Sequence, residues 1–109
     1  MDGFMDNRVL ELEAEILKAL AQPTRLKILE LLRNGEKCIC EIVPALHGEQ
    51  SNISRHISLM QKSYLVVTRK DGVRVMVKVR GPEIFKILDQ VGLLLKHRIG
   101  EQNLLLSSL

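Results

Sequence analysis

The chain has 109 residues, of which 46% are hydrophobic and 27% charged, a composition that excludes a disordered protein and fits a single domain over residues 1–109. No apolar run approaches the roughly 18 residues of a membrane span. The first residues also lack the basic flank and apolar core of a secretion signal, so we expect a cytoplasmic protein with no membrane partner. In that compartment Cys38 and Cys40 are expected to be reduced thiols rather than a structural disulfide.

Positive charge is concentrated in the second half of the chain. Residues 51–80 carry seven Lys and Arg against a single Asp, whereas residues 1–50 carry more acidic than basic residues. A localised positive field suits a polyanion, because contacts between basic side chains and phosphates release counterions. The alternative is a solvated face with an accidental surplus of basic residues.

Four helices are predicted in the first 63 residues from apolar residues at helical spacing. Their ranges are 7–20, 23–32, 39–46 and 51–63. Pro23 suits the first turn of the second helix, because its missing N–H is not needed there. Ser51 is the expected N-cap of the fourth helix. This fourth helix is expected to bury one stripe of side chains, formed by Ile53, Ile57, Met60 and Tyr64.

The pattern then changes from helical to extended. Two β-branched runs, 65–70 and 74–79, flank Asp71-Gly72, which is a strong signal for a hairpin turn. Valines alternate with Arg74, Met76 and Lys78 in the second run, so the face opposite the valines is expected to carry charge. A last helix is predicted from Glu83 to about Gly100, and a continuation through residues 103–106 is left open. The predicted fold is mainly α with a small β-hairpin, in the order α-α-α-α-β-β-α.

Two short helices followed by a basic hairpin describe a winged helix-turn-helix, in which the second helix enters the major groove of DNA. Four polar residues of the fourth helix, from Ser51 to Lys62, fall within about 60° of one another opposite its apolar stripe. Arg55 suits guanine, Gln50 or Asn52 suits adenine, and the serines suit bases or phosphates. The hairpin side chains are expected to contact the backbone or the minor groove. The predicted DNA-binding residues are Gln50, Ser51, Asn52, Ser54, Arg55, Ser58, Lys62, Arg69, Lys70, Arg74 and Lys78.

The two end helices carry more apolar surface than a short domain easily covers. The first has two apolar stripes, and the last is apolar along Ile84, Leu88, Val91 and Leu95 as well as on an adjacent stripe. A two-fold pair of chains would bury both, which predicts a homodimer. The alternative is a helix buried entirely within its own subunit.

Three segments resemble one known family. Residues 21–32 are similar to the opening segment of the ArsR/SmtB repressors, residues 50–57 to their recognition helix, and Cys38-Ile39-Cys40-Glu41 to their arsenic-sensing signature. The resemblance covers residues 10–98, with the motifs in the right order and spacing. It implies a dimer joined through helices 7–20 and 83–100. It also implies release from a double-stranded DNA operator when a metal or metalloid binds.

Two thiols two residues apart point about 200° from each other in a regular helix, so they converge on one ion only at a frayed first turn. Soft thiolates select As(III), Sb(III) or soft divalent metals, and such an ion is the expected inducer of a protein with no obligatory cofactor. Some arsenic-sensing members carry a third cysteine where this chain has Val43. Asp89 and His97 lack the second histidine of the family's zinc site. Inert buried thiols and redox-sensing thiols are the alternatives for the pair.

The sequence contains no glycine-rich phosphate loop, no supported Ser/His/Asp arrangement and no evident carboxylate pair, so we expect no enzyme. His56 lies beside the buried stripe of the fourth helix, where a packing or phosphate role is expected. A regulator that is independent of metal, or that responds to thiol redox state, remains an alternative. So does a winged-helix module for protein–protein interaction.

Overall fold

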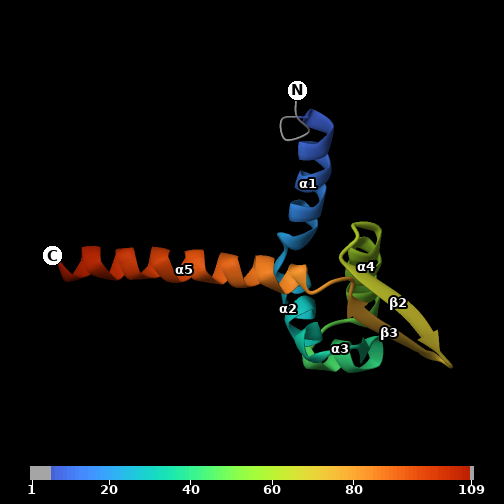
Figure 1. Ribbon diagram of the computed structural model, residues 1–109. Helices are drawn as coiled ribbons and strands as arrows, with labels where there is room; N and C mark the ends of the chain where they lie inside the picture. The colour runs from blue at the N-terminus through green and yellow to red at the C-terminus, as the bar shows by residue number, and fades with distance from the viewer. Residues whose placement is uncertain (1–5, 109) are drawn as a thin grey trace.

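The computed structural model describes residues 6–108 and contains the predicted helices and hairpin in the predicted order (Figure 1). The elements are α1 (Asn7–Leu20), α2 (Pro23–Leu31), the 3-10 turn η2 (Leu32–Asn34), β1 (Lys37–Cys38), α3 (Ile39–Ala45), α4 (Gln50–Lys62), β2 (Val66–Asp71), β3 (Arg74–Val79) and α5 (Glu83–Ser107). The winged helix-turn-helix fold is thereby confirmed. The last helix takes the longer of its two predicted lengths and reaches Ser107.

Local signals explain where the helices begin. The Asp6 carboxylate accepts a hydrogen bond from the backbone N–H of Arg8 and caps α1. Gln22 caps α2 in the same way, through a 2.9 Å bond from the N–H of Arg25, and Pro23 occupies the first turn as predicted. The expected N-cap of α4 is wrong by two positions, because the helix begins at Gln50 with Glu49 as its N-cap.

The sheet has three antiparallel strands in the order β1-β3-β2, one more than the sequence predicts. The two residues of β1 are too few to show any alternation, so no sequence pattern announces them. Cys38 lies opposite Met76 in the pairing of β1 with β3. Met76 is therefore buried rather than part of a charged face, which corrects the alternation expected for β3. Gly72 begins the two-residue hairpin loop with φ +63, a left-handed conformation that glycine adopts without strain.

The core lies between α2, α3, α4 and the inner face of the sheet, and α1 and α5 reach it only with one end each. Its fully buried side chains include Ile28, Ile42, Ile53, Leu65 and Val77. These side chains come from three helices and two neighbouring strand regions, so this part of the fold is one rigid unit.

Tyr64 does not belong to the buried stripe of α4, which corrects the prediction for this residue. It adopts φ +69 just beyond the end of the helix, and its side chain is 66% exposed. The left-handed residue turns the chain, so that Leu65 donates to the carbonyl of Met60 at 2.9 Å and continues into β2. The exposed ring is covered by the guanidinium of Arg80, 3.8 Å from its centroid.

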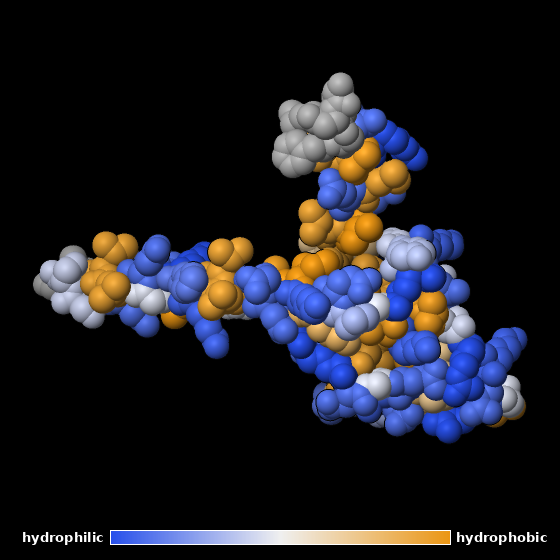
Figure 2. All heavy atoms as spheres, viewed as in Figure 1, coloured by the Kyte–Doolittle hydropathy of each residue, from blue (hydrophilic) through white to orange (hydrophobic). Residues whose placement is uncertain are grey.

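Helices α1 and α5 project from the body in different directions (Figure 1). The radius of gyration is 17.2 Å, against about 13 Å for a compact chain of this length. Only the first turns of α5 pack on the core, through Ile84, Ile87 and Leu88. Figure 2 shows hydrophobic side chains on the surface along α1 and at intervals along α5. No helix within residues 6–108 is long and apolar enough to cross a membrane.

Candidate nucleic-acid interface and thiol pair

The exposed side of α4 carries the polar side chains predicted to contact DNA. Its buried residues, among them Ile53, Ile57 and Met60, pack into the core and leave the opposite side in solvent. Of the predicted residues in or next to this helix, Ser54 alone is half-buried. The exposed ones are Gln50, Ser51, Asn52, Arg55, Ser58 and Lys62.

A shallow cavity of about 560 Å³ lies at the N-terminus of α4 and is lined by Glu49, Ser51, Asn52 and Arg55. The Arg55 guanidinium donates to the Asn52 side-chain oxygen at 3.1 Å, so the two side chains are presented together. Among residues 6–108 no side chain caps this N-terminus, which leaves its first amide groups available to a phosphate. The carboxylate of Glu49, which no sequence motif singles out, opposes a bound phosphate here. This end of α4 therefore offers hydrogen-bond donors and acceptors suited to base edges and phosphates.

The hairpin formed by β2 and β3 is the wing of the fold. Its two arginines predicted to contact DNA, Arg69 and Arg74, form ion pairs with acidic side chains outside the wing. Arg69 of β2 forms a bidentate ion pair with Glu36, with Nε–Oε2 and Nη2–Oε1 distances of 3.0 and 2.6 Å. This hydrogen bonding lowers the pKa of Glu36 and raises that of Arg69. Arg74 of β3 donates to Glu41 of α3 at 3.3 Å. Both arginines are exposed, but each must leave or share a carboxylate to contact DNA.

The predicted lysines are placed differently. Lys62, Lys70 and Lys78 are exposed, and no ion pair among residues 6–108 involves them. Lys62 extends from the last turn of α4, and Lys70 and Lys78 extend from the two strands of the wing. These three ammonium groups are the ones most available for phosphate contacts.

His56 lies on the inner side of α4 and is 5% exposed, which agrees with the packing role expected for it. Its Nδ1 accepts a hydrogen bond of 3.2 Å from the Nε of Arg25 in α2. Burial lowers the pKa of His56, and the charges of Arg55 and Arg25 lower it further. No local pattern predicts this contact, because the two residues are 31 positions apart.

Cys38 and Cys40 are joined in a disulfide, which corrects the expectation of two reduced thiols. Cys38 has an extended backbone and is the N-cap of α3, so its sulfur turns back over the first helical turn. There the sulfur accepts a bond from the N–H of Cys40 at 3.0 Å. The two sulfur atoms, which were expected to converge only at a frayed first turn, therefore meet at the N-cap of α3. Cys38 is 1% exposed, and Cys40 is exposed.

The remaining candidate metal ligands are not brought together. Asp89 accepts a 2.8 Å bond from Arg33, which also pairs with Glu30 and lies over the ring of Phe85. These contacts fasten the start of α5 to the end of α2. Among residues 6–108, no group of three or more His, Cys, Asp and Glu side chains is arranged to hold a metal ion.

Comparison with known proteins gives a consistent result. The family profile described as "Bacterial regulatory protein, arsR family" matches residues 22–67. An uncharacterized HTH-type transcriptional regulator of Methanocaldococcus jannaschii is 41% identical over 85 residues, which are 74% of this chain and 96% of that protein. The arsenical resistance operon repressor of Escherichia coli is 44% identical over 62 residues, 56% of this chain and 53% of the repressor.

Among solved structures, the homodimeric winged helix-turn-helix DNA-binding domain of a possible ArsR-family regulator from Mycobacterium bovis superposes with a TM-score of 0.78. It is 26% identical in sequence, and the match covers 93% of this chain and 95% of that domain. The similarity therefore extends beyond the helix-turn-helix to the end helices.

Proposed function

Because this chain belongs to the arsR family of bacterial regulatory proteins and is a DNA-binding transcriptional regulator, we propose that it is a homodimeric repressor controlled at Cys38 and Cys40. It is a regulator and not an enzyme. The observation that carries the proposal is the position of the cysteine pair, at the cap of the helix that precedes the recognition helix.

In this proposal α4 is the recognition helix and lies in the major groove. Arg55 and Asn52 contact base edges near the N-terminus of the helix, where their side chains are already joined. Lys62, Lys70 and Lys78 contact phosphates on either side. The hairpin extends away from the body beside α4 (Figure 1), as a wing that reaches the adjacent backbone or minor groove requires.

The proposed dimer joins α1 and α5 of two chains, and the similar M. bovis domain is described as homodimeric. Along α1, Leu10, Leu12 and Leu17 are 45%, 42% and 57% exposed. Val91, Leu94 and Leu95 of α5 are exposed to a similar or greater degree. A second copy of the chain would remove this surface from water, and burial of apolar area stabilises a complex by about 25 cal/mol per Å².

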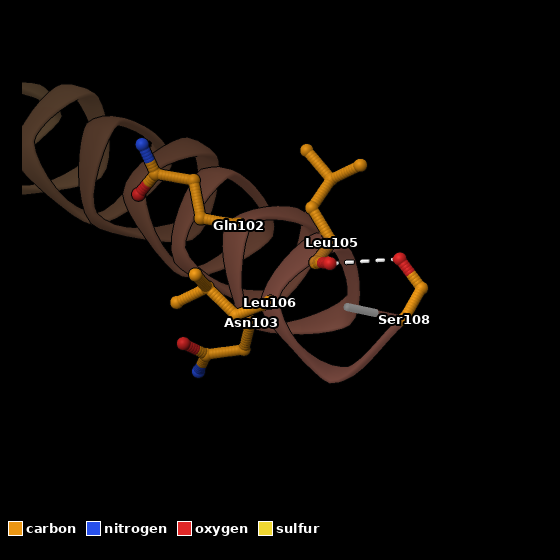
Figure 3. Close-up of a pocket in the computed structure, with 5 residues that line it drawn as sticks. All are labelled: Gln102, Asn103, Leu105, Leu106 and Ser108. Carbon is orange, nitrogen blue, oxygen red and sulfur yellow. Dashed lines mark hydrogen bonds between the residues drawn. The ribbon is translucent and has the colours of Figure 1, made fainter.

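The apolar surface continues to the end of α5. A shallow cavity of about 520 Å³ lies there beside Leu105 and Leu106, and the Ser108 hydroxyl donates to the carbonyl of Leu105 at 2.7 Å (Figure 3). Gln102 and Asn103 form its polar side. We assign this surface to the same dimer interface.

A chain of hydrogen bonds leads from the cysteine pair to the wing. The backbone N–H of Cys38 donates to Oε1 of Glu41 at 3.0 Å, and the same oxygen accepts from Arg74 of β3 at 3.3 Å. Cys38 also pairs with Met76 of β3 in the sheet. A ligand that displaces Cys38 therefore acts on the start of α3 and on the wing at once. This coupling supports release from DNA as the response.

Arsenite or another soft metal ion is the first candidate signal. Reduction of the disulfide gives two sulfur ligands that already face each other at the α3 cap. The operon repressor of E. coli, similar over about half of this chain, is named for arsenical resistance. The described side chains supply no third ligand, so a complete site requires water or a small thiol.

Thiol oxidation is the second candidate signal, and the disulfide itself favours it. A hydroperoxide removes two electrons from the dithiol. One thiolate attacks the peroxide and breaks its O–O bond, which gives a sulfenic acid and, after protonation, the alcohol that corresponds to the hydroperoxide (water in the case of hydrogen peroxide). The second sulfur then forms the S–S bond and displaces the hydroxyl group of the sulfenic acid as water. Exposed Cys40 is the sulfur that meets the oxidant, and buried Cys38 is the resolving partner.

The test is operator binding by fluorescence anisotropy, with a duplex from the upstream region of the gene. Reduced protein is measured alone, with arsenite, and after hydrogen peroxide treatment. We expect one of the two agents to weaken binding by between about fivefold and about 150-fold. The Cys38→Ser, Cys40→Ser double variant should bind normally and respond to neither. Responses unchanged in this variant would contradict control at the cysteines.

A further inference from the structure

We propose that Arg25 is a positioning residue, which holds the recognition helix α4 at its DNA-reading angle relative to α1 through a hydrogen bond to His56. The inference rests on the proposed role of α4 in reading DNA and of α1 in forming the dimer. It assigns sequence discrimination to a side chain that lies on the side of α4 away from the DNA.

One guanidinium joins three helices. Arg25 lies in the first turn of α2, and its Nε donates to Nδ1 of His56 in α4 at 3.2 Å. Its Nη1 donates to the carbonyl oxygen of Ala19, in the last turn of α1, at 3.3 Å. Ala19 and His56 are 4% and 5% exposed. Because the guanidinium is planar and rigid, these two bonds fix the end of α1 relative to the middle of α4.

The junction of α1, α2 and α4 is open to solvent on one side. A cavity of about 300 Å³ lies where α1, α2 and α4 meet, lined by Glu15, Lys18, Ala19, Arg25, Leu59 and Ser63. On this open side fewer side chains are in contact than in a filled core, so packing there defines the angle between the helices less strictly. The directional bonds of Arg25 supply the constraint that the side-chain packing lacks.

The hydrogen bond from Arg25 to His56 requires one particular tautomer of the neutral imidazole. Nδ1 accepts a hydrogen bond from Arg25, so Nδ1 carries no hydrogen and the neutral ring has its hydrogen on Nε2. The charged groups around it are Arg25 of α2 and Arg55 of α4, while Glu15 and Lys18 of α1 line the adjoining cavity. The nearest charges are positive, and they keep Nδ1 available as an acceptor at neutral pH.

The consequence for DNA reading follows from the order of residues in α4. His56 faces inward and its neighbour Arg55 faces outward. A rotation of the helix about its inner contact therefore moves Arg55 across the base edges. Because Arg25 also holds α1, the same bonds set the separation of the two recognition helices in the dimer. A loss of these bonds should reduce sequence discrimination more than total affinity.

The experiment compares binding to the upstream duplex with binding to a scrambled duplex of the same length. Arg25→Met keeps the aliphatic stem and removes the donors, and Lys27→Met is the matched control on an exposed site of α2. We expect Arg25→Met to lower the ratio of specific to non-specific affinity by about tenfold or more, and Lys27→Met to preserve it. A wild-type ratio in Arg25→Met would overturn the proposal.

A second pair of variants separates positioning from folding. His56→Leu removes the acceptor, whereas His56→Asn places its side-chain oxygen near the position of Nδ1. We expect the discrimination ratio to fall in His56→Leu and to be restored in His56→Asn, with both proteins dimeric. An equal loss in both variants would contradict the role of the hydrogen bond.

The imidazole itself gives a measurement that does not depend on DNA. Long-range ¹H–¹⁵N correlations of the wild-type protein should show unprotonated Nδ1 and protonated Nε2 at neutral pH. A protonated Nδ1 would overturn the inference even if the operator is bound tightly. A wild-type protein that binds no DNA would contradict the proposed function. In that case the spectrum would still show whether Nδ1 of His56 is free to accept the hydrogen bond from Arg25.

Discussion

Arg69 and Glu36 form a bidentate ion pair, with N···O distances of 2.6 and 3.0 Å, that joins the wing to the segment before β1. A side chain predicted to contact DNA is thus already engaged with a carboxylate. Solvent screens the attraction within such an exposed pair, so DNA phosphates can compete for the guanidinium. Glu36 therefore limits the positive charge that the wing presents.

Glu36→Gln should strengthen DNA binding and make it more sensitive to salt. The substitution removes the charge that holds Arg69, and one more phosphate contact would steepen the slope of log affinity against log salt by about 0.9. Anisotropy titrations at several salt concentrations give this slope. Glu101→Gln removes the same charge from the far end of α5 and is the control. Equal slopes in both variants would show that Arg69 remains away from the DNA.

Arg55→Ala should reduce discrimination at one base pair by about 1–3 kcal/mol. The side chain lies at the exposed N-terminal part of α4, in contact with Asn52, where a bidentate pair with guanine is accessible. The measurement is binding to a set of duplexes that differ at single positions. Uniform weakening over the whole set would instead assign Arg55 to a phosphate.

Leu95→Glu should convert the dimer to a monomer at micromolar concentrations. The side chain is 51% exposed on the apolar stripe of α5, and burial of one leucine contributes about 1.5–3 kcal/mol. Each dimer contains two copies, so we expect the dissociation constant to rise by at least about tenfold. Sedimentation equilibrium measures it, with the variant Lys96→Gln, at an exposed position about 100° around the helix from Leu95, as the control. A dimer that survives Leu95→Glu would place the interface elsewhere.

The free energy of unfolding should fall as the pH decreases below 6.5, which is the ordinary pKa of an imidazole. Burial and nearby positive charges lower the pKa of His56 in the folded state, so the unfolded state binds its proton first. The contribution of neutral His56 is therefore complete above 6.5 and is lost as the pH falls toward the lowered folded pKa. Urea unfolding between pH 7 and 5 measures this loss. The slope of the free energy of unfolding against pH should be smaller in His56→Asn than in the wild-type protein. An equal slope in the two proteins would assign the effect to other groups.

The local elements were predictable because their signals are local. Apolar periodicity and the Pro23 start signal placed the helices, and the Asp71-Gly72 pair placed the hairpin. The two-residue β1 was missed because so short a segment has no periodicity. Tyr64 was assigned to a helical stripe, since the sequence does not reveal that its backbone becomes left-handed. The continuation of the last helix to Ser107 was left open by its pattern.

The site was predictable in its outline and not in its contacts. The exposed face of α4 follows from its period, so the exposure of Arg55 and Lys62 is confirmed, while their contacts with DNA stay a prediction. The ion pair of Arg69 joins residues 33 positions apart, which no local pattern reveals. For the cysteines, the convergence at the first turn was anticipated, and their oxidation state was not. The expectation of thiols came from the cellular compartment, whereas the N-cap geometry of Cys38 brings the sulfurs together.

The most direct test of the account is the affinity of the reduced protein for the upstream duplex and a scrambled one, over a range of salt concentrations. We expect the upstream duplex to be bound at least about 10³-fold more tightly, and log affinity to fall linearly with log salt for both. Affinity that is independent of salt, or equal for the two duplexes, would contradict an operator-reading winged helix.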